Sequence, residues 1–91
     1  MNAYITDIAQ KTVRERLAEV LLLLKDNFYL DLDNTLQISL TREELANTVG
    51  TATESIIRLL SEFKQDKLID LDGRKIKMIN IPGLTKVANL R

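Results

Sequence analysis

The chain has 91 residues, of which 45% are hydrophobic and 29% charged, and its thirteen basic residues balance thirteen acidic ones. That length suits one domain with a modest core, and the lack of cysteine and histidine excludes disulfides, zinc fingers and thiol or histidine catalysis. No apolar run approaches the roughly 20 residues of a membrane span and no signal-peptide pattern opens the chain, so we expect a cytoplasmic protein.

Residues 1–11 are predicted to be the end of a separate helix that precedes the folded domain. Tyr4, Ile5 and Ile8 form a short apolar stripe, which does not continue in phase through Lys11 and Thr12. We therefore expect a hinge near Lys11 and a folded domain over residues 12–91. The apolar stripe needs a partner, either a second copy of the chain or a further domain.

The spacing Thr-x-x-Glu occurs at Thr12 with Glu15, at Thr41 with Glu44 and at Thr51 with Glu54. In such a capping box the hydroxyl and the carboxylate bind backbone amides of the first helical turn. Apolar residues of helical period follow each pair, so we predict helices at about 13–26, 42–49 and 52–64. The predicted buried residues are Val13, Leu17, Val20, Leu21 and Leu24, then Leu45, Ala46 and Val49, then Ile56, Leu59, Leu60 and Phe63. The leucine run at 21–24 widens the first stripe, so we expect that helix to be buried on several sides.

Two segments have the pattern of β structure. Residues 35–40 (TLQISL) alternate between apolar and polar side chains and predict a short, half-buried strand. Farther on, Asp72-Gly73 separates two β-like runs, which predicts a hairpin with a type I′ turn at that dipeptide. The expected pairing sets residues 69 and 71 against 76 and 78. Pro82-Gly83 should then break the strand, and residues 84–90 should form a last short helix.

The second and third helices are joined so tightly that they cannot lie antiparallel. A helix end at Gly50 leaves only Thr51 before the next helix, which predicts a crossing near the ~90–120° of a helix-turn-helix. A corner in some other small α-domain is the alternative. The strand before this pair and the basic hairpin after it favour the winged form. We predict an α+β, mainly helical fold: a winged helix-turn-helix with a three-helix core, a short strand and a C-terminal β-hairpin wing.

The zero net charge hides an uneven distribution along the chain. Residues 63–91 carry seven Lys or Arg against three Asp, whereas residues 29–62 carry two basic and six acidic residues. The C-terminal third is therefore predicted to form an electropositive face, which suits an anionic partner.

The chain resembles the C-terminal DNA-binding domain of the Crp/Fnr family of bacterial transcription regulators over residues 12–81. The family's pattern is a T-R-x-[DE]-[IL]-[AG] helix, a glycine turn, a recognition helix close to E-[TS]-[VI]-x-R-[IL]-L, and a short wing. The matching residues are Thr41-Arg42, Glu44, Leu45, Ala46, Gly50, Glu54-Ser55-Ile56 and Arg58-Leu59-Leu60. The resemblance implies double-stranded DNA as partner, with an inverted repeat bound by a homodimer of the full-length protein. It makes RNA polymerase a further candidate partner and residues 1–11 the end of a dimerisation helix.

Several family features are missing from this sequence. The effector-binding sensor domain would lie upstream, so we expect no cofactor in this chain, and the iron–sulfur cysteines of the Fnr branch are absent. Thr53 stands where the Crp type has a second base-reading arginine, and Thr51 stands after the glycine where an apolar residue is common. The Crp sequence preference should therefore not be carried over intact.

Glu54 has three candidate roles: capping with Thr51, pairing with Arg58 at i+4, or accepting from a cytosine amino group in the major groove. A surface ion pair contributes only about 0.3–0.5 kcal/mol and does not account for the apolar Ile57 beside it. A base-reading face of Thr53, Glu54, Ile57 and Arg58 accounts for all of these residues. Arg58 would bind guanine, and the methyl groups of Ile57 and Thr53 would lie against thymine methyls. The resemblance implies the same roles for Glu54 and Arg58.

The candidate phosphate contacts lie at helix N-termini and on the wing. They are Thr41, Arg42, Thr51, Ser55, Arg74, Lys75 and Lys77. Capping is the alternative for the first and third of these residues, and a solvated surface charge is the alternative for Arg42. Glu43 and Glu62 are predicted to be solvated charges. With no catalytic or metal-binding set we expect no enzyme, and a winged helix that contacts protein through Ile57 is the alternative function.

Overall fold

A computed structural model describes residues 11–28, 30–32, 34–36 and 40–89 of the chain. Its elements are helices α2 (Val13–Asn27), α3 (Arg42–Val49) and α4 (Thr53–Gln65), strands β1 (Ile69–Asp72) and β2 (Lys75–Met78), and helix α5 (Ile81–Val87). The apolar stripe at residues 4–8 and most of the predicted linker helix lie outside the described residues.

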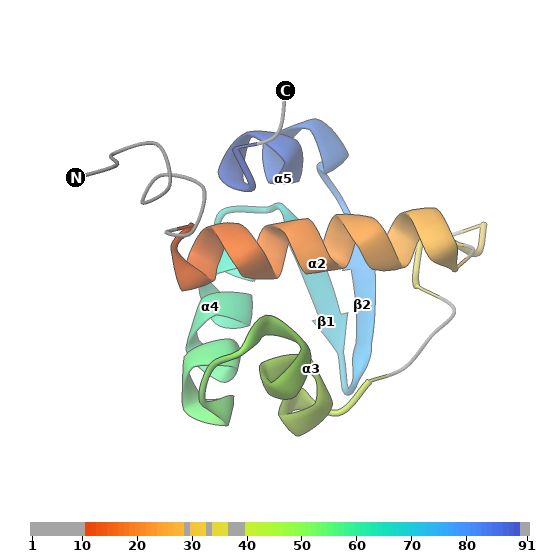
Figure 1. The fold of residues 1–91 in the computed structure, drawn as a ribbon. Coiled ribbons are helices and arrows are strands. Elements are labelled where there is room, and N and C mark those ends of the chain that lie inside the picture. Colours follow the sequence, from red (N-terminus) through yellow and green to blue (C-terminus); the bar gives the residue numbers. More distant parts are fainter. Residues whose placement is uncertain (1–10, 29, 33, 37–39, 90–91) are drawn as a thin grey trace.

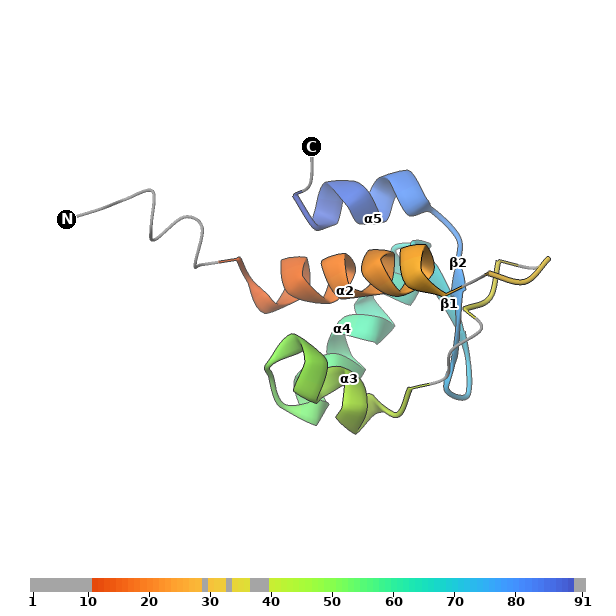
Figure 2. The same cartoon turned by 45° about the vertical axis from the view of Figure 1, so that its right-hand side comes forward.

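Helix α2 runs through the middle of the domain, as Figures 1 and 2 show. It packs against α3 on one side and against α5 on the other, while α3 packs on α4 and α4 on β1. This arrangement confirms the predicted α+β, mainly helical class. The predicted three-helix core is extended by α5, because Leu84 and Ala88 are fully buried in the same core.

The first helix begins as its sequence predicts. Thr12 and Glu15 form both hydrogen bonds of the capping box, and the helix continues to Asn27. Leu17, Leu21 and Leu22 are buried, but the side chain of Leu23 is 52% exposed. The expectation that the leucine run buries this helix on several sides is therefore wrong at Leu23, which the helical period turns toward solvent.

The turn between α3 and α4 follows the glycine prediction but not the third capping prediction. Gly50 has φ 86°, and the amides of Gly50 and Thr51 both donate to the Ala46 carbonyl, at 2.8 and 2.9 Å. Because the Thr51 backbone is used to finish α3, α4 begins one residue later than a Thr51 cap requires. Its N-cap is Ala52, which makes no side-chain cap hydrogen bond, so the predicted box of Thr51 with Glu54 is wrong.

The wing has the predicted register and a different turn. Ile69 pairs with Met78 and Leu71 with Ile76 in the antiparallel ladder, as expected. Asp72 pairs with Lys75, so the turn residues are 73 and 74 rather than Asp72-Gly73. Of these residues only Gly73 has a positive φ, 60°, which is the pattern of a type II′ turn and not of type I′.

The predicted strand at residues 35–40 is present in part. Leu36 N donates to Ile76 O at 2.9 Å and Met78 N donates to Asn34 O at 2.8 Å, which places this segment beside β2. Leu36 is buried. Residues 37–39 lie outside the described residues.

The last helix starts earlier than predicted. The Asn80 side chain accepts from Gly83 N at 2.9 Å, and Pro82 lies in the first helical turn. Proline is tolerated there because the first amides of a helix have no partner within it. Pro82-Gly83 therefore belongs to α5 instead of preceding it, and the predicted range 84–90 is wrong at its start.

Candidate nucleic-acid interface

Helix α4 has one buried face and one open face. Ile56, Leu59, Leu60 and Phe63 are buried in the core, as predicted. On the opposite side Ile57 is 51% exposed and the Arg58 side chain is 62% exposed. No other described segment covers this side, so α4 can lie against a large partner.

Neither structural role predicted for Glu54 is found. Its side chain is exposed and has no hydrogen-bond or ion-pair partner among the described residues. Arg58 pairs instead with Glu62, one turn farther along the helix, with Nη1 2.9 Å from Oε2. Glu54 is therefore left with both oxygens accessible, as a groove-facing acceptor requires. Thr53 and Ser55, at the start of the same helix, are half-buried.

The N-terminus of α3 is closed by Thr41 and Glu44 in the predicted capping box. The Thr41 amide donates to Glu44 Oε1 at 2.8 Å and the Thr41 hydroxyl accepts from the Glu44 amide at 3.0 Å. Hydrogen bonding of its carboxylate to Thr41, first to the backbone amide and next to the side chain, lowers the pKa of Glu44 below its ordinary value of 4.5. Both threonine groups are engaged in the cap, so capping is the observed role of Thr41.

Arg42 joins α3 to the wing. Its Nη2 donates to the Gly73 carbonyl at the hairpin turn, at 2.8 Å. Its Nη1 is buried without a hydrogen-bond partner among the described residues, and burial lowers the pKa of the guanidinium. Arg42 is half-buried and bonded to the wing, so it is more than a solvated surface charge. The contact holds the wing tip beside the start of α3.

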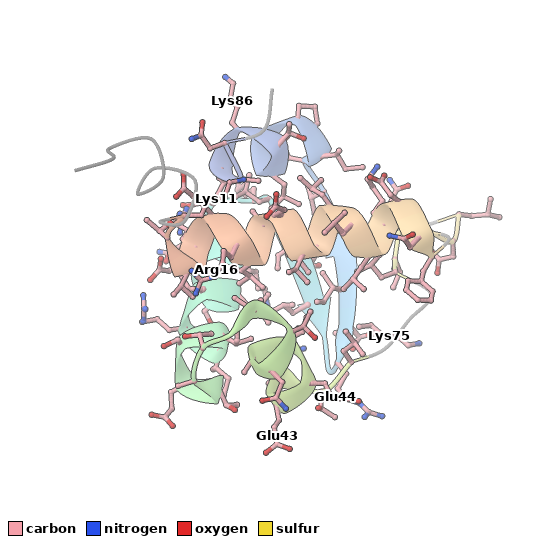
Figure 3. The ribbon with its side chains drawn as sticks, in the orientation of Figure 1. Lys11, Arg16, Glu43, Glu44, Lys75 and Lys86 are labelled. Atoms are coloured by element: carbon pink, nitrogen blue, oxygen red, sulfur yellow. The ribbon has the colours of Figure 1, made fainter. Side chains whose placement is uncertain are left out.

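The basic residues of the wing are exposed and partly balanced by carboxylates. Arg74, Lys75 and Lys77 all face solvent, as predicted, and Figure 3 shows Lys75 at the edge of the domain near the hairpin turn. In the ladder Lys75 lies opposite Asp72, and Lys77 lies opposite Asp70. The wing is thus less positive than its row of basic residues suggests, and its tip is its most cationic part.

A model of the family described as "Crp-like helix-turn-helix domain" matches residues 15–87. The chain belongs to this family. It is a family of helix-turn-helix domains and not of enzymes. The match confirms the resemblance seen in the sequence and the winged helix-turn-helix fold.

Curated relatives and solved structures agree with the Crp-like assignment. The chain is 28% identical over 83 residues to "Transcriptional activator protein FnrA" of Stutzerimonas stutzeri, covering 89% of this chain and 34% of that protein. It is 34% identical over 77 residues to "Transcriptional regulatory protein btr" of Bordetella pertussis, covering 80% and 31%. A CRP/FNR-family transcriptional regulator from Thermus thermophilus superposes with a TM-score of 0.80 at 26% identity, over 96% of this chain and 45% of that one. The chain therefore spans about a third of these curated relatives.

The Crp-like domain contains a charged network that the sequence prediction missed. The carboxylate of Glu62 accepts from Arg14 Nη1 at 3.0 Å as well as from Arg58, and Arg14 Nη2 lies 3.1 Å from Asp66. The prediction that Glu62 is a solvated charge is therefore wrong. Arg14 and Glu62 lie 48 residues apart in the chain, so no local pattern could indicate their contact.

A second set of hydrogen bonds, which the sequence prediction also missed, connects the start of the Crp-like domain to the helix-turn-helix. Arg16 donates through Nε to the Val49 carbonyl at the end of α3, at 3.1 Å, and through Nη1 to the Lys11 carbonyl, at 2.9 Å. The Lys11 ammonium in turn binds Glu19 and the Ala88 carbonyl. Figure 3 shows Lys11 and Arg16 together at the start of α2. The domain boundary predicted at residue 11 stays a prediction, but Lys11 itself is held by the folded domain.

None of the helices in the described part of the chain combines the length and the apolar character of a membrane span. The described residues also contain no group of three or more side chains that could hold a metal ion.

The lowered pKa of the capping glutamate predicts a pH-dependent contribution to stability. Because the folded-state pKa of Glu44 is lowered, its contribution is present above its ordinary pKa and is lost as pH falls through the lower, folded-state value. Glu44→Gln should therefore flatten the fall in unfolding free energy that occurs as the pH drops below the ordinary pKa of 4.5. Urea denaturation at a series of pH values measures this slope. Glu43→Gln removes a neighbouring exposed charge without touching the cap and should keep the wild-type slope; an equal change in both variants would contradict the cap as its origin.

Proposed function

We propose that this Crp-like domain binds duplex DNA sequence-specifically, as the output half of a Crp/Fnr-like transcription regulator. The observation that carries the proposal is the open face of α4, where an apolar and a cationic side chain stand exposed side by side while the opposite face is buried. A helix of this kind fits the major groove of B-DNA. Ile57 alone on a surface would need no explanation, but its position beside Arg58 and Glu54 matches the mixed chemistry of base edges.

In the proposed complex, each exposed residue of α4 has a chemical counterpart in the groove. Arg58 donates to guanine O6 and N7, and Glu54 accepts from the cytosine amino group, so each half-site contains a G·C pair. The methyl groups of Ile57 and Thr53 lie against thymine methyls. The free carboxylate of Glu54 supports its part in this scheme, because it need not break an internal hydrogen bond to accept from a base.

The phosphate backbone is held by the N-termini of two helices and by the wing. The proposed contacts are Thr41, Arg42, Thr51, Ser55, Arg74, Lys75 and Lys77. Arg42 already donates to Gly73, so its phosphate contact would use other guanidinium hydrogens. Its main contribution is to keep the wing tip close to α3, so that both reach the same stretch of backbone.

The whole regulator acts in the bacterial cytoplasm as a homodimer on an inverted repeat, with half-site centres about one helical turn apart. The effector binds a sensor domain outside this sequence, and RNA polymerase is a further partner. These statements rest on the family and on the share of its relatives that the chain spans.

Selection of bound duplexes from a random pool tests the proposed function. We expect an inverted repeat with a G·C pair in each half-site, and an affinity that falls linearly with the logarithm of salt concentration. Enrichment of no sequence would overturn specific DNA binding. Salt-insensitive capture of a protein through the Ile57 face would favour the interaction-module alternative.

The wing lysine should contribute affinity without sequence preference. Lys75→Ala should weaken binding to all duplexes by a similar factor and reduce the salt slope by about one unit, because one phosphate contact is lost. Fluorescence anisotropy at several salt concentrations measures both quantities. Lys86→Ala is the matched control, since Lys86 lies on α5, far from the wing in Figure 3. A loss confined to one sequence would assign Lys75 to base recognition instead.

A further inference from the structure

Arg58 stands at the end of a line of contacts that begins in the hydrophobic core. Phe63 is fully buried, and the Arg14 guanidinium lies over its ring, 4.9 Å from the centroid. Arg14 is fixed further by Glu62 and Asp66, at 3.0 and 3.1 Å. A guanidinium that stacks on a buried ring and binds two carboxylates has little freedom to rotate. The orientation of the Arg14 guanidinium at the surface of the core is therefore fixed.

Glu62 carries this restraint from Arg14 to Arg58. One of its carboxylate oxygens, Oε1, accepts from Arg14, and the other, Oε2, accepts from Arg58 Nη1 at 2.9 Å. Neither Nε nor Nη2 of Arg58 has a partner among the described residues. The bond to Glu62 thus uses one terminal nitrogen of Arg58 and leaves a pair of donors, Nε and Nη2, on a neighbouring edge. A pair of donors on one edge is what bidentate binding of guanine requires.

We infer that Glu62 is a positioning residue that orients Arg58 for base recognition, with Arg14 holding Glu62 in place. The inference rests on the proposed DNA-binding function and extends it to two residues outside the base-reading set. A long, exposed arginine loses rotamer freedom when it binds a base, and prior restraint by a carboxylate reduces that loss. Discrimination at the base pair that Arg58 contacts therefore depends on Glu62 and Arg14.

Two other roles of the same ion pair predict different results. A surface pair that only adds a little stability would leave sequence discrimination unchanged when it is removed. If the carboxylate competed with DNA for Arg58, its removal would have the opposite effect and would increase sequence discrimination. The ratio of affinities for two duplexes separates all three roles, because a general loss of folding or of charge attraction cancels in it.

The experiment compares binding of the selected duplex with binding of duplexes changed at single base pairs. Arg58→Ala first identifies the pair that Arg58 contacts. Glu62→Gln should then lower discrimination at that pair roughly three- to tenfold, within the range seen for coupled neighbours, and leave discrimination at other pairs unchanged. Arg14→Gln should have the same selective effect. In an Arg58→Ala background, Glu62→Gln should change nothing further at that pair.

The controls separate positioning from charge and from folding. Glu43→Gln also removes one exposed carboxylate, so it reports the effect of net charge alone and should leave every ratio intact. Circular dichroism establishes whether each variant is folded. If Glu62→Gln does not fold, Arg14→Gln tests the same positioning role. If the wild-type domain shows no base preference, the proposed function fails and this inference with it. If Arg58→Ala relaxes one base pair but Glu62→Gln leaves or raises discrimination there, the positioning role is wrong while the function stands.

Discussion

Replacing Arg58 with alanine should weaken binding to the selected duplex by about 1–3 kcal/mol and relax the choice at one base pair in each half-site. The physical reason is the loss of a bidentate donor pair that no other residue of the proposed base-reading face can supply. Glu54 is an acceptor only, and Ile57 and Thr53 offer methyl groups. Competition binding with duplexes changed one base pair at a time measures both effects.

A charge-preserving variant gives the control for Arg58. Arg58→Lys keeps the positive charge but loses the planar fork, so it should retain the salt slope while discrimination at the same pair falls. If Arg58→Ala lowers affinity equally for every duplex tested, then Arg58 is a backbone contact and the base-reading role is wrong.

Phe63→Ala should destabilise the domain by about 3–5 kcal/mol, a large part of the roughly 5–15 kcal/mol that folds a domain of ordinary stability. Phe63 is fully buried on the inner face of α4, and its ring also supports Arg14. The substitution therefore opens a cavity and removes the surface on which that guanidinium stacks. Urea denaturation followed by circular dichroism measures the change.

Phe63→Leu separates the two contributions of the ring. Leucine fills most of the cavity but offers no aromatic face. The loss of unfolding free energy should therefore be clearly smaller than for Phe63→Ala, and it should include the stacking of Arg14 on the ring. A cost for Phe63→Ala below about 1 kcal/mol would mean that α4 is not anchored through this residue, since smaller core truncations already exceed that value.

Local sequence signals were sufficient for most of the helix and strand boundaries. Thr41 with Glu44 and the glycine at position 50 predicted both ends of α3, because a capping box and a left-handed C-terminal residue are satisfied within a few residues of the chain. The alternating pattern of the hairpin predicted its register for the same reason, since a slip by one residue would expose Ile69 and Met78. The helical period of the apolar residues in α4 likewise predicted which face of that helix is open.

Two of the predictions that failed involved groups with more than one available partner. Thr51 and Glu54 have the spacing of a cap. The Thr51 amide instead donates to the Ala46 carbonyl, and α4 starts one residue later than such a cap requires. Arg58 has acidic residues one turn away on both sides, at 54 and 62. It pairs with Glu62, whose carboxylate Arg14 already holds. Spacing along a helix indicates which pairs can form, and the packing of other elements selects among them.

The sequence alone was enough to predict helices α2 to α4, the wing register, the family resemblance and the open face of α4, because each depends on contacts between near neighbours or on a local motif. Only the tertiary structure decided the neighbours of those residues: Arg14 beneath Glu62, Arg42 against the wing turn, and Arg16 between Lys11 and the end of α3. Charged side chains are long and hydrogen-bond through their tips. Their partners are therefore set by which backbones the folded core brings together, and the order of residues does not contain that information in any local pattern.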